Sequence, residues 1–273
     1  MSAPEHEAIM RTEERRRIVS WCDKLFSVPS AGFGLEPHFA SGSSLLDSLS
    51  PLLNKIAADT PTNITVEKNE PFAFEFSGDD GFKYGIDFHR VFVNFQHKMR
   101  FRSVSGGLPV GELLSSAQPY TTLLPTILDR LVEATLCLPR SKERHITRTG
   151  IVSTTDVDEK DLPPGLTRLI TYFRRPWIDV TGGFSVNITG IVDNNDEHTD
   201  RCIHQIKKSD DQENTMLSVK LDWQRNYRKI KPITKDVLKE ELERARRSAL
   251  AYFEDVGEGN RFDEEILRST TNS

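Results

Sequence analysis

The chain has 273 residues, which is enough for one large domain or two small ones with a substantial core. Lys and Arg number 36 against 41 Asp and Glu, a formal net charge of −5. A field of that sign does not attract nucleic acid or an anionic membrane, so either would need a local basic patch.

The cysteines and the apolar runs exclude further classes. Cys22, Cys137 and Cys202 are far apart, so the sequence encodes neither a disulfide framework nor a zinc knuckle. The first 17 residues are highly charged, unlike a signal peptide, and no run approaches the roughly 20 apolar residues of a membrane helix. We therefore expect a cytoplasmic protein that binds no membrane, metal or cofactor.

The first predicted element is a helix that begins near Thr12, with apolar residues recurring at helical spacing. We expect residues 1–28 to form a helical arm. Ile18, Trp21 and Leu25 on that arm are candidates for contact with a protein partner.

Glycine, proline and serine dominate residues 27–44 and predict a loop, which contains "PSAGFGLEP". The two glycines of "GFG" lack the third glycine of a nucleotide-binding turn, because Pro37 follows instead. A second amphipathic helix is predicted at residues 45–56, with Pro51 accommodated in a first turn.

Alternating aromatic residues then predict a β-hairpin. "FAFEF" places Phe72, Phe74 and Phe76 on one face of a strand, and "SGDDG" is a turn signal. "FKYGIDF" repeats the alternation in the following strand, and its apolar side chains are Phe82, Tyr84, Ile86 and Phe88.

The stretch "FHRVFVNFQHKMRFR" at residues 88–102 has an apolar face and a cationic or polar face, as a half-buried antiparallel strand requires. Fifteen residues exceed a usual strand, so a turn is expected at residues 94–97. We favour this structural interpretation. The functional alternative is a surface on which a nucleotide base stacks on an aromatic ring between cations. Its residues would be Arg90, Phe92, Lys98, Arg100 and Arg102.

The rest of the chain predicts a helix capped by Thr121 or Thr122, then strands with one short helix, then a closing helix capped by Thr234. The strands are predicted at residues 145–154, 184–192, 201–207 and 216–223, and the short helix at 166–175. The pattern indicates an α+β fold, a mainly antiparallel curved sheet packed against long amphipathic helices. We expect one domain over residues 29–267, with a subdivision near 140 as an alternative, and a disordered tail at 268–273.

Two stretches resemble known phosphate-binding or metal-binding motifs but lack residues that those motifs require. "GGLPVG" continues with Glu112 and Leu113 where a phosphate loop needs Lys and Ser or Thr. The acidic loop at residues 193–200 lacks the glycine and the terminal glutamate of a calcium loop. No catalytic or metal-binding residue is predicted, and only a site assembled in space from distant residues would make the protein an enzyme.

Two further basic clusters accompany aromatic residues. "YFRRPW" contains Arg174 and Arg175, and "QRNYRKIK" contains Arg225, Arg228 and Lys229. Together with the cations of residues 88–102 they could form one basic face, although a solvated surface is the favoured interpretation.

The second half is similar to a sporadically distributed family of bacterial proteins of comparable length and no established activity. The resemblance covers about residues 144–267 and comprises a strand carrying Arg148, a late strand with Asp222 and a charged closing helix at 234–255. It implies the fold and a bacterial origin. The first half departs from the family pattern, because this chain is predicted to open with a helix instead of a strand.

These observations leave three hypotheses. The first is a non-catalytic soluble interaction protein, a subunit of a bacterial multi-protein system, with a protein partner or a homo-oligomer. The alternative is a nucleotide or single-stranded nucleic acid binder that uses the basic and aromatic clusters. The third is an enzyme with a spatially assembled site.

Overall fold

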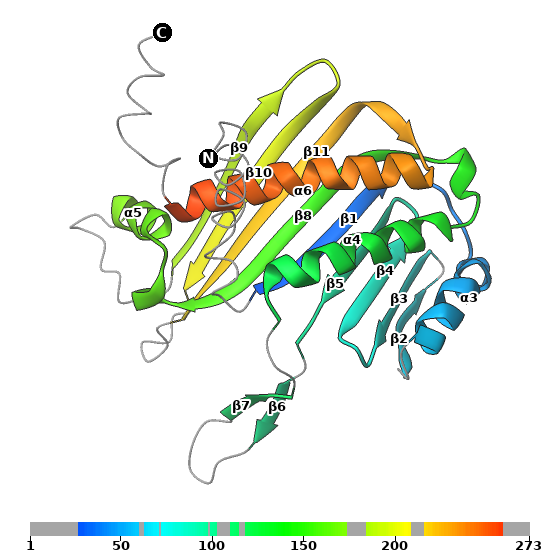
Figure 1. The fold of residues 1–273 in the computed structure, drawn as a ribbon, viewed down its shortest axis with the longest axis horizontal. Helices are drawn as coiled ribbons and strands as arrows, with labels where there is room; N and C mark the ends of the chain where they lie inside the picture. The colour runs from blue at the N-terminus through cyan, green and yellow to red at the C-terminus, as the bar shows by residue number, and fades with distance from the viewer. Residues whose placement is uncertain are drawn as a thin grey trace, which may run out of the picture.

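The structure is a computed structural model that describes residues 27–59, 63–70, 72–97, 99–102, 110–114, 118–173, 184–208 and 216–258. It is an α+β protein with one open antiparallel sheet of nine strands, in the order β2-β3-β4-β5-β1-β8-β11-β10-β9 (Figure 1). The first five strands in sequence are β1 (Ser27–Leu35), β2 (Ile64–Glu70), β3 (Ala73–Gly78), β4 (Phe82–Asp87) and β5 (Arg90–Phe95). The other four are β8 (His145–Asp158), β9 (Phe184–Asn194), β10 (His198–Lys208) and β11 (Met216–Pro232). A separate hairpin of β6 (Met99–Arg102) and β7 (Val110–Leu113) projects from the sheet.

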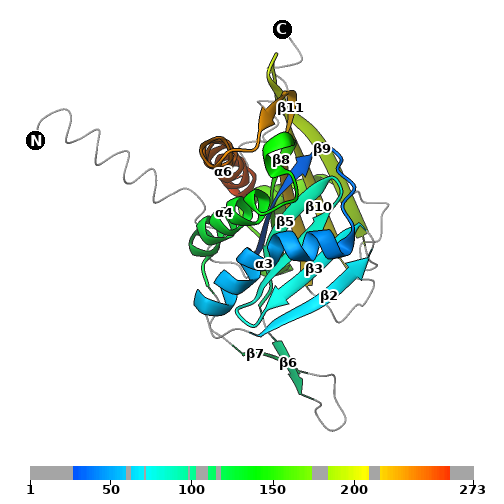
Figure 2. The ribbon, with the colours of Figure 1, turned by 90° about the vertical axis from the view of Figure 1, so that its right-hand side faces the viewer.

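The helices lie on one side of this sheet. They are α3 (Gly42–Asp59), α4 (Tyr120–Leu136), α5 (Pro164–Phe173) and α6 (Lys235–Glu258), with short 3-10 turns at Ser141–Glu143 and Glu159–Asp161. α4 packs on β1 and β5, and α6 packs on β8 and β11, on the same side (Figure 2). No helix in the described ranges covers the opposite side, which we call the open face. No described helix combines the length and the apolar character needed to cross a membrane.

The topology repeats itself across the centre of the sheet. β1 and β8 pair antiparallel in the middle. β1 is followed by α3, then by β2 to β5, which run in order from the outer edge of the sheet to β1, and then by α4, which packs on β1 and β5. β8 is followed in the same way by α5, by β9 to β11, and by α6, which packs on β8 and β11. The described elements therefore form two units of similar topology about an approximate two-fold axis between β1 and β8, with four returning strands in the first unit and three in the second.

The core lies between the helices and the sheet and confirms the predicted hairpin. Phe74 and Phe76 of β3 are buried beside Tyr84 of β4, whose ring stacks on Phe76 with 4.6 Å between the centroids. Phe72, by contrast, is 49% exposed, because β3 begins one residue later.

The two-faced interpretation of residues 88–102 is confirmed for β5. Val91, Val93 and Phe95 are buried on the helix side, and Arg90 and Phe92 alternate with them on the open face. β5 ends at Phe95, within the predicted turn at residues 94–97, and β6 then pairs with β7 instead of continuing the sheet.

The predicted loop at residues 27–44 is wrong for its first nine residues, which form β1. This strand is central, since Ser30–Gly34 pair with β5 and the whole strand pairs with β8. Pro29 lacks an N–H donor but lies before the first residue of the β5 ladder, so it pairs only with β8. Tertiary pairing on both sides overrides the weak strand propensity of glycine, serine and proline.

Two helix details also differ from the expectation. Pro51 lies inside α3, at its tenth position, and not in its first turn. α4 begins at Tyr120 with Pro119 as N-cap, so Thr121 and Thr122 lie within the first turn. The predicted cap of α6 is confirmed, because the N–H of Val237 donates to Thr234 Oγ1 at 3.4 Å.

Tyr84 makes the stability of this core dependent on pH. Its ring is buried, and burial raises the pKa of Tyr84 from 10.0 to about 12. As the pH rises, the unfolded chain therefore loses this proton before the folded protein does. The contribution of Tyr84 to the free energy of unfolding is fully present below pH 10 and is lost as the pH rises toward 12. We expect the free energy of unfolding to fall by about 1 kcal/mol more between about pH 9 and 11 in the wild type than in Tyr84→Phe. Urea unfolding at both pH values measures this, and equal losses would contradict it.

Candidate functional site

Five residues from five neighbouring strands form one row across the centre of the open face. In spatial order they are Gly85, Phe92, Gly32, Gly150 and Gln224. The row on one side contains Arg90, Gly34 and Arg148, and the row on the other contains Asn94, Ser30, Val152 and Asp222. These rows enclose a hollow of about 270 Å³, which we call the central trough.

The trough is hollow because Gly32, Gly34 and Gly150 place no side chain on its floor. Glycine weakens a strand interior and often marks a close approach by a ligand or another backbone. A Cβ at Gly32 would lie 2.9 Å from the Val91 carbonyl oxygen, so crowding accounts for that glycine. At Gly150 the nearest atom is the Trp223 carbonyl oxygen at 3.8 Å, so packing within the described residues leaves room for a side chain there.

Phe92 forms one wall of the trough. Its ring lies over Gly85, where a Cβ would come within 2.1 Å of the ring Cζ. The Arg90 guanidinium lies 5.4 Å from the ring centroid and is held by Asp87, whose Oδ2 accepts from Arg90 Nε at 2.6 Å. The wall therefore combines a partly buried aromatic ring with a cation whose charge is already neutralised.

Arg148 provides the charge that is not neutralised. Its side chain lies beside Gly34, with Nε 3.5 Å from the position of a Cβ there. None of the described residues forms a hydrogen bond or ion pair with its guanidinium. Asp222, the carboxylate in the trough, instead accepts from Gln224 Nε2 at 3.0 Å and lies 3.7 Å from Lys220 Nζ. An anion in the trough would therefore meet an available guanidinium.

The two halves of the open face differ in their charges. In the first half, Lys83 lies between Glu67 and Glu75, with Nζ–O distances of 2.6 and 2.9 Å. The hydrogen bond to Glu67 raises the pKa of Lys83, and the same bond lowers the pKa of Glu67. In the second half, Arg201 and Lys207 of β10 are exposed and have no ion pair among the described residues. Available positive charge therefore extends from Arg148 toward β10.

The structure separates the residues of the predicted basic face. Arg90 and Phe92 lie at the central trough. Arg225 is buried, and its Nε and Nη2 both donate to Asp200 at 2.8 Å. Arg228 donates to Asn194 Oδ1 at 2.6 Å.

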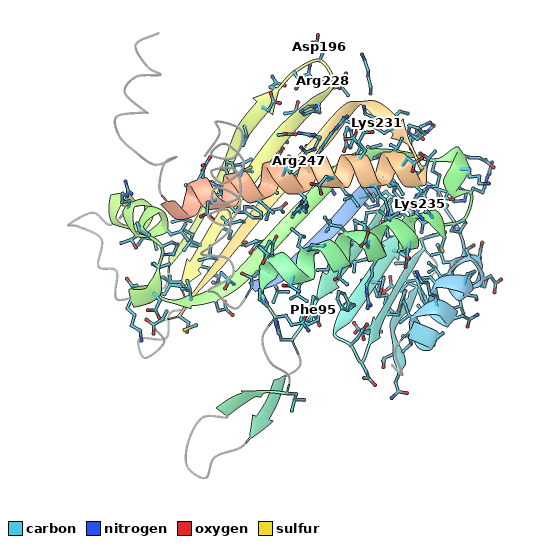
Figure 3. All side chains as sticks on the ribbon, in the orientation of Figure 1. Phe95, Asp196, Arg228, Lys231, Lys235 and Arg247 are labelled. Atoms are coloured by element: carbon cyan, nitrogen blue, oxygen red, sulfur yellow. The ribbon has the colours of Figure 1, made fainter. Side chains whose placement is uncertain are left out.

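Arg228 lies beside the β9–β10 turn that carries Asp196, whereas Phe95 lies at the opposite end of the sheet (Figure 3). Lys229 is exposed in the same irregular stretch of β11 as Arg228. The cluster of residues 225–229 therefore does not join the chain around β6.

Several predicted residues cannot be placed by their side chains. Arg100 and Arg102 lie in β6, but only their backbone is described. The remaining candidates lie outside the described residues: Lys98, Arg174, Arg175, Ile18, Trp21 and Leu25.

Sequence reasoning missed Arg148 as a site residue and all three glycines of the floor. A signal was present in "SAGFGL", where small residues alternate with Ala31, Phe33 and Leu35. That period of two is typical of a strand whose other face has been kept free of side chains.

The acidic turn at residues 193–200 brings Asp193, His198 and Asp200 together, with ligand atoms within 4.8 Å of one another. His198 Nε2 lies 3.2 Å from Asp193 Oδ2, and Asp200 is engaged by Arg225. These protein contacts account for the cluster, and it is assigned no metal.

No protein-family model matches the chain, and no curated protein matches it. The fold and the central trough therefore define the class: a duplicated α+β protein with a hollowed, partly cationic open sheet face.

Proposed function

We propose that the protein is a non-catalytic binding protein whose central trough takes an anionic ligand with an aromatic ring, either a nucleotide or a segment of single-stranded nucleic acid. The observation that carries the proposal is the Arg148 guanidinium, available beside a floor of glycines and across from Phe92. A base can stack on the ring while its phosphate meets the guanidinium.

The lining favours binding over chemistry. The charged residues of the trough are Arg90, Arg148 and Asp222, and its lining contains neither histidine nor cysteine. Asp222 is hydrogen-bonded to Gln224 and not aimed at a nucleophile. This composition suits recognition of charge and a ring plane.

The cations beyond the trough favour a strand over a free nucleotide. Arg201 pairs in register with Gln224, so it lies in the same cross-strand row as the floor of the trough. Backbone phosphates that leave the trough toward β10 would meet Arg201 and then Lys207. A positively charged path with an aromatic platform is the common design of single-strand binding surfaces.

Fluorescence anisotropy with a labelled oligothymidylate tests the proposal, with ATP and AMP as competitors to distinguish a strand from a free nucleotide. We expect binding at low salt that weakens as salt rises, because phosphate contacts release counterions. Arg148→Ala should weaken binding about tenfold, equivalent to roughly 1.4 kcal/mol. Gly150→Val should do the same by filling the trough, where an added Cβ meets no atom closer than 3.8 Å, and thermal unfolding of the variant checks that the fold is retained.

Arg247→Ala is the matched control. This side chain is 69% exposed on α6, on the helix-covered side of the sheet, and its removal changes the net charge equally (Figure 3). Absence of binding to every probe at low salt would overturn the proposal. If Arg148→Ala and Arg247→Ala weakened binding equally, net charge alone would explain the binding, and the trough would not be the binding site.

Interaction with a protein partner is a second candidate, favoured by an exposed aromatic cluster. Phe39 is 65% exposed and stacks on Phe88 with 5.1 Å between ring centroids. The Phe39 and Phe72 rings are in a T-shaped arrangement, with 5.5 Å between their centroids. Aromatic residues are enriched in protein interfaces. Chemical cross-linking in the source cells followed by affinity purification tests it, and recovery of the protein alone would count against it.

We further propose that the sheet is curved and packed against long amphipathic helices. We also propose that the protein is cytoplasmic and bacterial and is a subunit of a multi-protein system. Fractionation of source cells and the identity of purified partners would test the location and the assembly.

A further inference from the structure

The two edge strands of the sheet differ in how they discourage pairing. β2 carries Glu67, Lys68 and Glu70, and its register shifts between Val66 and Lys68. Charged side chains and irregularities of this kind protect a sheet edge from other strands. β9 has neither charge nor proline from Phe184 through Val192. β9 also has a register shift, but it falls at Val192, at the end of the uncharged stretch, so Ser185 to Ile191 form a regular edge without charge.

The unprotected edge also exposes apolar side chains. Ile191 is 62% exposed and Val192 is 37% exposed. On the helix side, Ile188 is only partly buried against the core. The inner edge of β9 pairs with β10 along the strand, and no described strand pairs with its outer edge. A long, uncharged edge with exposed apolar residues is a site for strand addition.

We infer that β9 pairs with β9 of a second copy of this chain, antiparallel about a two-fold axis at Ile188. In that register Asn187 faces Thr189 of the second copy, and Ser185 faces its Ile191. Every facing position from Ser185 to Ile191 is then uncharged, and Asp193 lies beyond the ladder. The edge is therefore compatible with itself, as an isologous interface requires.

The dimer would leave the central trough open. β9 lies at the outer edge, separated from β8 by β10 and β11, and pairing would use only its free edge. Two nine-stranded sheets would then continue into one another. The inference is independent of the proposed ligand, since neither Arg148 nor Phe92 takes part.

Sedimentation velocity of the full chain, from about 1 to 100 μM, tests the inference. A ladder of seven residues, Ser185 to Ile191, is smaller than a standard interface, so we expect a dimer with a dissociation constant on the order of 10 μM. Asn187→Lys with Thr189→Lys places like charges opposite each other at two points, and it should weaken the dimer at least about tenfold. Both side chains are exposed, so the monomer fold should be retained.

The matched control is Thr65→Lys with Asn69→Lys, which makes the same charge change at exposed positions of β2. It should leave the dimer unchanged. If the β9 double variant has a lower melting temperature than the wild type, Ile191→Lys is used in its place, because the Ile191 side chain is largely exposed. A wild-type monomer at the highest concentration would overturn the inference, and so would a dimer that the β9 variants leave intact.

Discussion

Replacing Asp200 with alanine is expected to lower the free energy of unfolding by about 3–5 kcal/mol. The Asp200 carboxylate accepts from both Nε and Nη2 of Arg225, at 2.8 Å each. Only 5% of the Asp200 side chain and 9% of the Arg225 side chain are exposed. Without the carboxylate, the buried guanidinium would lose its ion-pair partner and both of these hydrogen bonds, and water could not replace them without opening the structure.

Urea unfolding of the wild type and Asp200→Ala measures this loss. The control is Glu70→Ala, which breaks an ion pair with Lys68 whose side chains are 59% and 38% exposed. An exposed pair of that kind contributes less than about 1 kcal/mol. Similar losses in the two variants would mean that Arg225 finds another partner or reaches solvent, contrary to the structure.

Adding one methyl group at Gly32 is expected to destabilise the protein, whereas the same change at Gly150 is not. At Gly32 the new Cβ would lie 2.9 Å from the Val91 carbonyl oxygen and 3.1 Å from Phe92 Cβ. β1 is central, so relief requires movement of paired backbone, at a cost of about 1–3 kcal/mol. Gly150→Ala meets only an oxygen at 3.8 Å and should be neutral or stabilising by up to about 1 kcal/mol.

The two variants can be compared directly because Gly32 and Gly150 are cross-strand partners. Both are glycines on the same face of two central strands, and they differ in the space available for a Cβ. Thermal and urea unfolding of the two alanine variants measure the difference. Equal destabilisation would mean that the floor at Gly150 is as crowded as at Gly32, and it would contradict the trough.

The elements predicted correctly were those with a strong local period. In β3, β4 and β5, aromatic or β-branched residues alternate with polar ones, and α6 repeats Leu238, Leu242 and Ala245 at helical spacing. β1 was missed because its strand character comes from β5 and β8, which are distant in sequence. The duplication was missed because β6 and β7 and an additional strand lengthen the first unit, so the sequence has no fixed period.

The candidate site was predictable only in part for a related reason. Arg90 and Phe92 were identified because the cations and rings of residues 88–102 are adjacent in sequence. Arg148 and Gly150 became site residues through the register of β1 with β8, which no local pattern specifies. The predicted basic face failed at Arg225 because alternation along β11 turns that side chain away from Gln224 and inward.

The duplicated fold has a consequence for orientation. The axis between β1 and β8 relates backbones but not side chains, since Phe92 occupies β5 while the matching face of β11 offers Lys220, Asp222 and Gln224. An elongated ligand whose two ends differ would therefore bind in a defined direction, because each end would contact different side chains. A nearly symmetric backbone would in this way bind such a ligand in one direction only.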